Sequence, residues 1–407
     1  MPTVALLLPT ATYRAADFLA AARALDVDVV VVSERRQALA GSMGDRALVA
    51  NFDRPDDAAA ELVELAARSP LDAVVAVDDQ GVIVAAQASE RLGLRGNPAD
   101  AVAATRDKAR FRRALAAAAV RQPDFREVGP HDDAGRAATD VGLPCVVKPV
   151  ALSGSRGVIR VDRASGAGEA ASRVRAILES AGEACDGTLL VERFVAGREI
   201  AVEGLLGGGT LEVLAVFDKP DPLDGPYFAE TIYVTPSRLP AAALDDAVRA
   251  VAAACAACGL VEGPVHAELR IDDGGIPWML EVAARSIGGH CSRALRFATN
   301  TTLEELILRH ALGLPVDTLL QRESAAAGVL MLPVEQAGTL TGVQGVEEAK
   351  AVQHITDVEI SIPPGRRIEP LPEGDRYFGF VLAKAPTPEL VEAALREACA
   401  RVKIEVS

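Results

Sequence analysis

The first hundred residues alternate short β-rich runs with helix-like segments, and this pattern restricts the fold more than any other feature of the chain. The β-rich runs cover residues 4–8, 29–32, 48–51 and 73–77, and helical patterns cover residues 15–24 and 57–68. Such alternation predicts a parallel sheet with helices on its faces. Ligands of these sheets gather at the carboxyl ends of strands, where the chain carries Asp78-Asp79-Gln80-Gly81.

The remaining three hundred residues form further units. We expect a Rossmann-like α/β domain at 1–104, a small subdomain with a linking helix at 105–188, a sheet-rich subdomain at 189–320 and a C-terminal α/β domain at 321–407. The linking helix is predicted at about 106–119, and 218–239, rich in proline, is predicted to be a long irregular loop. The last eighty or so residues are predicted to form a separate unit.

The charge of the chain limits its partners. Asp and Glu number 57 against 42 Lys and Arg, a formal net charge of −15. This argues against nucleic acid as the main partner, because phosphate backbones require neutralisation by Lys and Arg. The sequence contains no apolar run long enough to span a membrane and begins directly in a strand pattern. We therefore expect a cytoplasmic protein without a membrane partner.

A lysine at the end of an apolar strand is the first candidate for chemistry. The run Cys145-Val-Val-Lys148-Pro149 precedes a small-residue loop that contains Ser153, Gly154, Ser155 and Gly157. Lys148 can serve as a fixed cation for phosphates, and the backbone N–H groups of the loop can cap them. An edge lysine that extends into solvent is the alternative. The chain has no Gly-x-x-x-x-Gly-Lys-Ser/Thr sequence, which excludes a P-loop.

Two carboxylates flank a short apolar connector between two further strands. Glu192 ends one strand, Val195 lies in the connector and Glu199 opens the next strand. The backbone of such a hinge can hydrogen-bond an adenine edge, and a nearby carboxylate can bind ribose hydroxyls. A surface acidic pair is the alternative reading.

The strongest pattern lies on two strands joined by the turn Asp272-Asp273-Gly274-Gly275. Alternation places His266, Glu268 and Arg270 on one face of the first strand, while Glu281 lies in an apolar run of the second. Two carboxylates on neighbouring strands form an oxygen site for Mg²⁺. His266 is a catalytic candidate on this face, and a structural ion-pair network is the alternative.

Taken together, these residues resemble the ATP-grasp superfamily. The resemblance covers about residues 103–312 and, more weakly, both flanks, and the order and spacing of the motifs agree throughout. It implies the ATP-grasp fold: an N-terminal parallel α/β domain, a small lid domain, a central antiparallel-sheet ATP-binding domain and a C-terminal α/β extension. It also implies that Lys108 joins Lys148 in binding phosphates.

The resemblance further implies a nucleotide site and a metal site. The adenine hinge and ribose carboxylate match Glu192, Val195 and Glu199, and the metal carboxylates match Glu268 and Glu281. ATP and Mg²⁺, with Mn²⁺ as an alternative ion, are the implied cofactors. Many members have an Asn two residues after the second metal Glu, where this chain has Ala283, which puts the coordination of a second metal ion in doubt.

The pattern Glu-Val-Ala-Ala-Arg285 with Gly288-Gly289 is similar to the branch that contains the bacterial L-amino-acid ligases. That branch implies a carboxylate–amine ligase in which Arg285 acts on the acyl phosphate or the transferring phosphate. Glu230, Arg285, Gly288 and Gly289 are the expected substrate-binding residues, with Glu230 pairing with an amino group. A homodimer is expected only from the family.

Two alternatives remain open from the sequence. One is a carboxylase-type enzyme of the same fold that activates bicarbonate, although the chain lacks a biotin-carrier lysine motif. The other is a non-catalytic nucleotide-binding protein, against which the joint presence of Lys108, Lys148, Glu268, Glu281 and Arg285 argues.

Overall fold

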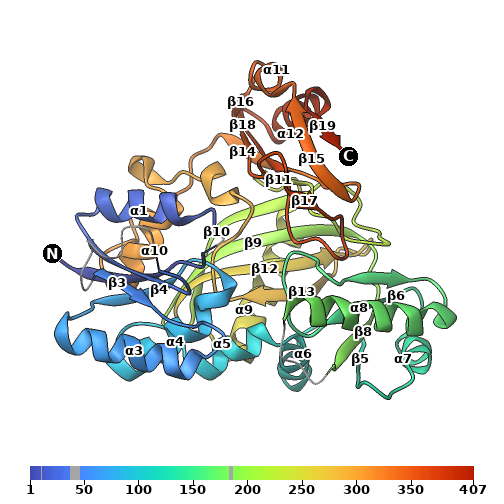
Figure 1. Cartoon of the computed structure of the whole chain (residues 1–407), viewed down its shortest axis with the longest axis horizontal. Coiled ribbons are helices and arrows are strands. Elements are labelled where there is room, and N and C mark those ends of the chain that lie inside the picture. Colours follow the sequence, from blue (N-terminus) through green and yellow to red (C-terminus); the bar gives the residue numbers. More distant parts are fainter. Residues whose placement is uncertain (11, 37–45, 183–186) are drawn as a thin grey trace.

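The N-terminal residues form a parallel sheet. A computed structural model describes residues 1–10, 12–36, 46–182 and 187–407 (Figure 1). The strand order is β3 (Ala47–Val49), β2 (Asp28–Ser33), β1 (Thr3–Leu7) and β4 (Ala73–Ala76), with helices α1 (Ala15–Ala24), α3 (Pro55–Arg68) and α4 (Val82–Leu92). The predicted parallel α/β arrangement is confirmed, and the Asp78–Gly81 turn follows β4 as expected.

The linking helix predicted at about 106–119 is confirmed as α6 (Lys108–Ala117), and a further helix that the sequence did not predict, α5 (Ala99–Arg106), precedes it. Asp107 separates helix α5 from helix α6. Asp107 has an extended backbone, and its carboxylate accepts hydrogen bonds from the N–H groups of Ala109 and Arg110. This N-cap fixes the start of α6. Lys108 consequently opens a helix, next to the small-residue loop of the following subdomain.

A small antiparallel sheet carries that loop. Its strand order is β5 (Phe125–Val128), β8 (Leu189–Arg193), β6 (Cys145–Pro149) and β7 (Ile159–Val161), with helices α7 (Ala134–Val141) and α8 (Ala167–Ala181). Strands β6 and β7 pair antiparallel on either side of the small-residue loop. We call residues 151–157 the lid loop.

An eight-stranded sheet forms the centre of the molecule (Figure 1). Its first four strands are β13 (Pro277–Ala283), β12 (Gly263–Ile271), β9 (Arg198–Gly207) and β10 (Thr210–Lys219), all antiparallel. The alternate residues Val265, Ala267 and Leu269 of β12 are buried in a core with α9 (Ala241–Cys258). The opposite face of β12 is therefore left for polar side chains.

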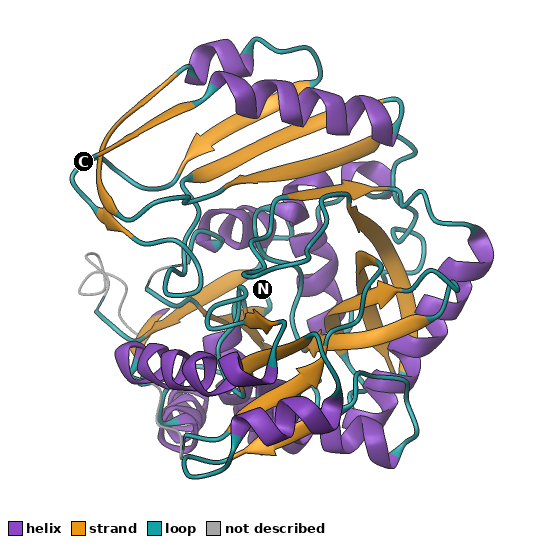
Figure 2. Cartoon of the chain, turned by 90° about the vertical axis from the view of Figure 1, so that its right-hand side faces the viewer, coloured by secondary structure: helices purple, strands orange, loops and turns teal. Residues whose placement is uncertain are grey.

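The last eighty residues extend this sheet and also form a small sheet of their own. Strand β11 (Ile232–Thr235), which the sequence did not predict within 218–239, pairs with β14 (Ala326–Leu332). Strands β18 (Gly379–Ala385) and β16 (Ile355–Ile360) follow in order, covered by α12 (Pro388–Arg401) (Figure 2). The sequence of β11 shows no alternation of apolar and polar residues, because all four of its side chains are buried. That pattern therefore could not predict the strand.

Shorter elements complete the chain. The helices are α10 (Leu303–Ala311) and α11 (Val346–Lys350), and a small sheet combines β17 (Arg367–Ile368), β15 (Gly338–Gln344) and β19 (Lys403–Val406). Among the described residues, no helix combines the length and apolar character needed to cross a membrane. The four domain boundaries given above stay predictions.

Candidate active site

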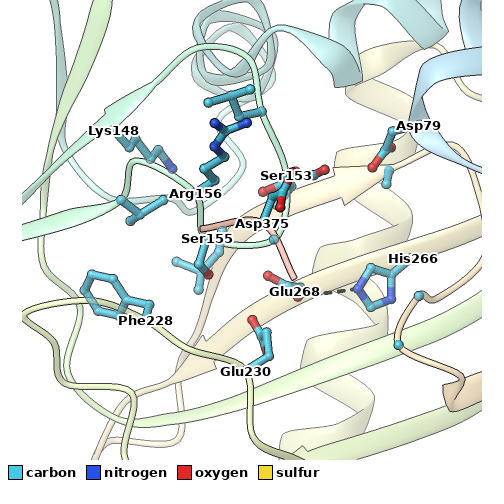
Figure 3. A pocket seen from close by; sticks show the side chains of 18 of the residues that line it. Asp79, Lys148, Ser153, Ser155, Arg156, Phe228, Glu230, His266, Glu268 and Asp375 are labelled. Carbon is cyan, nitrogen blue, oxygen red and sulfur yellow. Dashed lines mark hydrogen bonds and ion pairs between the residues drawn. The ribbon is translucent and has the colours of Figure 1, made fainter. Parts of the chain in front are cut away.

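A cavity of about 540 Å³ lies where the four parts of the chain meet. Its walls come from the N-terminal domain (Tyr13, Asp79), the lid loop (Ser153, Arg156), the central sheet (Glu230, Glu268) and the C-terminal strands and loops (Met331, Asp375). Figure 3 shows the side chains of Glu230 and Glu268 directed into this space. A cavity with walls from every part of the chain is a natural place for two or more substrates to meet.

The structure brings nearly all the predicted site residues to this cavity. On its wall lie Lys108, Lys148, Ser153, Gly154, Ser155, Glu192, Val195, Glu199, Glu230, His266, Glu268, Glu281, Arg285, Gly288 and Gly289. Gly157 is not among the lining residues. Its N–H donates instead to the carbonyl of Pro372 at 2.9 Å, and an added Cβ would lie 3.3 Å from the ring of Pro149.

The two lysines expected at the phosphates enter the cavity from different elements. Lys108, the first residue of α6, donates to the Leu152 carbonyl at 2.8 Å and lies 3.3 Å from Glu281 Oε1. Lys148, on β6, lies 2.8 Å from Glu192 Oε2. Burial lowers the pKa of Lys148 to about 8, although Glu192 partly opposes this shift. A substantial fraction of Lys148 is therefore neutral in mildly alkaline solution.

Glu192 is held in a buried ion-pair network and is not one of a surface acidic pair. Arg112, whose side chain is 0% exposed, binds both carboxylate oxygens at 2.6 and 3.0 Å. The same guanidinium donates to the carbonyls of Met279 and Leu280 on β13. Burial by itself would raise the pKa of Glu192, but Arg112 and Lys148 outweigh it and lower the pKa to about 2. Glu192 is thus a fixed anion that orients Lys148.

The hairpin of β12 and β13 brings Glu268 opposite Glu281. Directly opposed residues of antiparallel strands place their side chains on the same face. A register shift after Glu268 leaves Leu280 as an extra residue of β13. His266, Glu268 and Arg270 all face the cavity, as the alternation predicted.

A lysine that we did not select from the sequence lies at the centre of the carboxylate cluster. Lys219, the last residue of β10, lies 2.7 Å from Glu199, 2.9 Å from Glu268 and 3.0 Å from Glu230. Burial would lower the pKa of Lys219, but the three carboxylates raise it well above its usual value. Burial and two neighbouring carboxylates raise the pKa of Glu230 to about 7, against the opposing effect of Lys219.

The N-terminal domain fixes the segment that contains Arg285. Arg285 donates to Asp79 at 2.9 Å, and Arg106 lies 3.2 Å from the same carboxylate. Burial would raise the pKa of Asp79, yet the two guanidiniums hold it below its usual range. One edge of the cavity is therefore built by the turn after β4.

His266 connects two carboxylates at the base of the cavity. Its Nδ1 lies 3.4 Å from Glu203, and its Nε2 lies 3.4 Å from Glu268. Glu203 is fully buried and accepts the N–H of Ile287. Burial would lower the pKa of His266, but Glu203 and Glu268 raise it. This geometry suits a positioning role between β9, β12 and the segment after Arg285.

Comparison with known proteins agrees with this geometry. Family models match an ATP-grasp N-terminal domain at residues 19–96, an ATP-grasp domain at 141–294 and an L-amino acid ligase C-terminal domain at 330–407. An L-amino acid ligase structure from Bacillus licheniformis superposes with a TM-score of 0.81 at 26% identity, over 100% of this chain and 99% of that one.

The chain belongs to the L-amino-acid-ligase branch of the ATP-grasp family.

Two further relatives indicate how far the similarity extends. The alanine–anticapsin ligase of Bacillus subtilis is 26% identical over 275 residues, covering 63% of this chain and 58% of that ligase. The chain spans only 58–61% of the length of the first curated relatives it matches. A biotin carboxylase from Campylobacter jejuni shares the fold alone, with a TM-score of 0.67 at 15% identity over 99% of this chain and 92% of that one.

ATP-grasp ligases use ATP with divalent metal ions, and the carboxylates of this ATP-grasp protein suit such an ion. Glu199, Glu230 and Glu268 each place an oxygen within 4.8 Å of the others, and Glu281 lies across the hairpin from Glu268. An all-oxygen set of this kind fits Mg²⁺ or Mn²⁺. The expected ligands Glu268 and Glu281 stay a prediction, and Glu199 and Glu230 are additional candidates.

Three residues that organise the site were missed from the sequence. Lys219 lies at the end of an apolar strand, as Lys148 does. The argument that selected Lys148 from the sequence, a lysine at the end of an apolar strand, would also have selected Lys219. Arg112 lies four residues after Lys108, which places both on one side of α6. Asp79 lies in the polar turn that was noted, but its partner Arg285 is two hundred residues away and no local pattern connects the two.

Proposed function

We propose that this ATP-grasp protein is an ATP-dependent ligase that joins a small carboxylic acid to an amine through an acyl phosphate and releases ADP and phosphate. The observation that supports this most is the shared cavity. Lys108 and Lys148 line it together with paired carboxylates and Arg285, and the buried Lys219 pairs with three of those carboxylates. The ligases it resembles add weight to the proposal.

Phosphoryl transfer would occur beside Lys108 and Lys148, which both line the cavity. An oxygen of the substrate carboxylate attacks the γ-phosphorus of ATP, and the bond from that phosphorus to the β–γ bridging oxygen breaks as ADP leaves. Lys108 and Lys148 neutralise charge on the phosphates during this step. A divalent ion on Glu268 and Glu281 would supply further charge neutralisation.

Amide formation would follow at the end of the cavity lined by Arg285, Gly288 and Gly289. The amine nitrogen attacks the acyl carbon, the carbon–oxygen bond to phosphate breaks, and the nitrogen loses a proton. Arg285, which lines the cavity, would stabilise charge on the departing phosphate. Glu230 lines this cavity and would bind a substrate ammonium group if the substrates are amino acids, as the amino-acid ligases that this chain resembles support.

A screen of substrate pairs tests this proposal. ADP and phosphate release from MgATP is measured with all pairs of proteinogenic amino acids, with bicarbonate in a separate well. We expect release that depends on the pair, together with a product whose mass corresponds to an amide. Release with bicarbonate alone would replace the ligase by a carboxylase.

A further inference from the structure

The lid loop contacts a loop of the C-terminal part of the chain. We call residues 369–378, between β17 and β18, the C-terminal loop. Its Pro372 carbonyl accepts the N–H of Gly157 at 2.9 Å, and its Glu373 carbonyl accepts the Nε–H of Arg156 at 3.0 Å. Two adjacent carbonyls of one loop therefore hold two adjacent residues of the other.

The helix behind the lid loop reaches the same residue. Arg173 of α8 forms a two-pronged ion pair with Glu373, at 2.6 Å from Nε to Oε1 and 2.9 Å from Nη2 to Oε2. Its remaining Nη1 donates to the Tyr227 hydroxyl at 2.6 Å. Paired guanidinium–carboxylate bonds fix direction as well as distance. Glu373 thus binds the lid subdomain through its side chain and its backbone.

The C-terminal loop also lines the cavity. Asp375, Arg376 and Tyr377, which begin two residues after Glu373, lie on the cavity wall. Figure 3 shows Asp375 near Ser153 and Arg156 of the lid loop, which lie on the same wall. Movement of either loop at Glu373 would therefore change how the cavity is closed.

We propose that Glu373 is a positioning residue whose pairing with Arg173 holds the lid loop against the C-terminal loop. This contact keeps the cavity closed between formation of the acyl phosphate and attack by the amine. This inference rests on the proposed ligase function. Without the pair, water enters and attacks the acyl phosphate, the bond to phosphate breaks, and the products are the free acid, ADP and phosphate, with no amide. ATP would then be consumed without the amide being made.

The Arg173–Glu373 pair is partly exposed to solvent, so its loss should affect the closure of the cavity more than the stability of the fold. The side chains of Arg173 and Glu373 are 43% and 36% exposed, so solvent screens their attraction and their removal has little effect on global stability. The pair of Lys384 and Glu323, with exposures of 45% and 36%, lies away from the cavity wall and is a matched control.

The first test measures amide formed per ADP released. We expect Glu373→Gln and Arg173→Gln each to lower this ratio by about 2- to 5-fold, the range that one half-exposed ion pair allows. Glu323→Gln should leave the ratio unchanged. The double charge reversal Arg173→Glu with Glu373→Arg should restore it in part. A ratio that is unchanged in both single variants, or that falls equally in Glu323→Gln, would overturn the proposal.

A second measurement is independent of the ligase reaction. Hydrogen exchange of a peptide containing Gly157 is measured in the Glu373→Gln and Glu323→Gln variants. A non-hydrolysable ATP analogue and Mg²⁺ are present in both measurements. Faster exchange in Glu373→Gln than in Glu323→Gln supports the contact, and equal exchange rejects it. If the wild type forms no amide with any pair, the proposed function fails, while the exchange result still decides whether Glu373 holds the lid loop.

Discussion

Two buried lysines that pair with carboxylates of the cavity wall have opposite pKa shifts. Lys148 faces one carboxylate, Glu192, which Arg112 already binds from the other side, and burial lowers the pKa of Lys148 to about 8. Lys219 faces three carboxylates, and its pKa is raised well above the usual value. Burial acts on both lysines, so the difference between their pKa shifts comes from the number of carboxylates around each. Lys219 is a permanent cation, whereas Lys148 can lose its proton near physiological pH.

Removal of Lys219 should have the largest effect. Lys219→Met leaves Glu199, Glu230 and Glu268 buried together without their shared cation. We expect the free energy of unfolding, measured with urea, to fall by about 3–5 kcal/mol, the usual loss when one partner of a buried pair is removed. Lys384→Met, at a half-exposed lysine, is the control and should be nearly neutral.

The same variant tests whether the three carboxylates can hold a metal ion. Mg²⁺ should raise the melting temperature of Lys219→Met more than that of the wild type, because a divalent cation can replace the lost ammonium. Equal effects of Mg²⁺ on both proteins would show that the cluster is not a metal site.

Removal of Arg112 should have the next largest effect on the free energy of unfolding. Arg112→Met takes the two-pronged partner from Glu192 but leaves Lys148 in place, so we expect a loss of about 3 kcal/mol in urea unfolding. Arg112 also lowers the pKa of Lys148, so its removal should raise that pKa. If the pKa of Lys148, measured by NMR titration, were unchanged in a folded variant, the network as described would be incorrect.

The titration of Lys148 predicts an alkaline decline in ATP capture. Protonated Lys148 binds phosphate, so kcat/KM for ATP should fall by about tenfold per pH unit above pH 8, since this ratio reports the free enzyme. Lys148→Arg, which stays protonated, should remove the decline. The same shift makes this lysine's contribution to stability rise between about pH 8 and 10.5, where the unfolded state binds the extra proton.

Glu230 should give the smallest effect. Its pKa is about 7 in the folded protein against a usual 4.5, so its contribution to stability is present below pH 4.5 and is lost as the pH rises through 7. Glu230→Gln should remove this dependence in urea unfolding between pH 5 and 8. It should also raise KM for the amino-acid substrate more than KM for ATP. Equal changes in both KM values would contradict the substrate role of Glu230.

The sequence predicted what local patterns can encode. Strand alternation placed His266, Glu268 and Arg270 on one face. The apolar run that ends near Lys148 correctly predicted a strand, and the small residues after it correctly predicted a loop. The partners of these residues were harder to predict. Glu192 binds Arg112 from eighty residues away, and Glu373 reaches Arg173 across two hundred residues. Such pairs depend on how separate units pack, which no single stretch of sequence specifies.

The acyl phosphate is the central claim, and oxygen transfer tests it directly. The acid substrate is labelled with ¹⁸O in its carboxylate, and the phosphate released with MgATP and the amine is analysed by mass spectrometry. The account predicts one ¹⁸O atom in the phosphate for each amide formed. ADP and amide formation with unlabelled phosphate would contradict it.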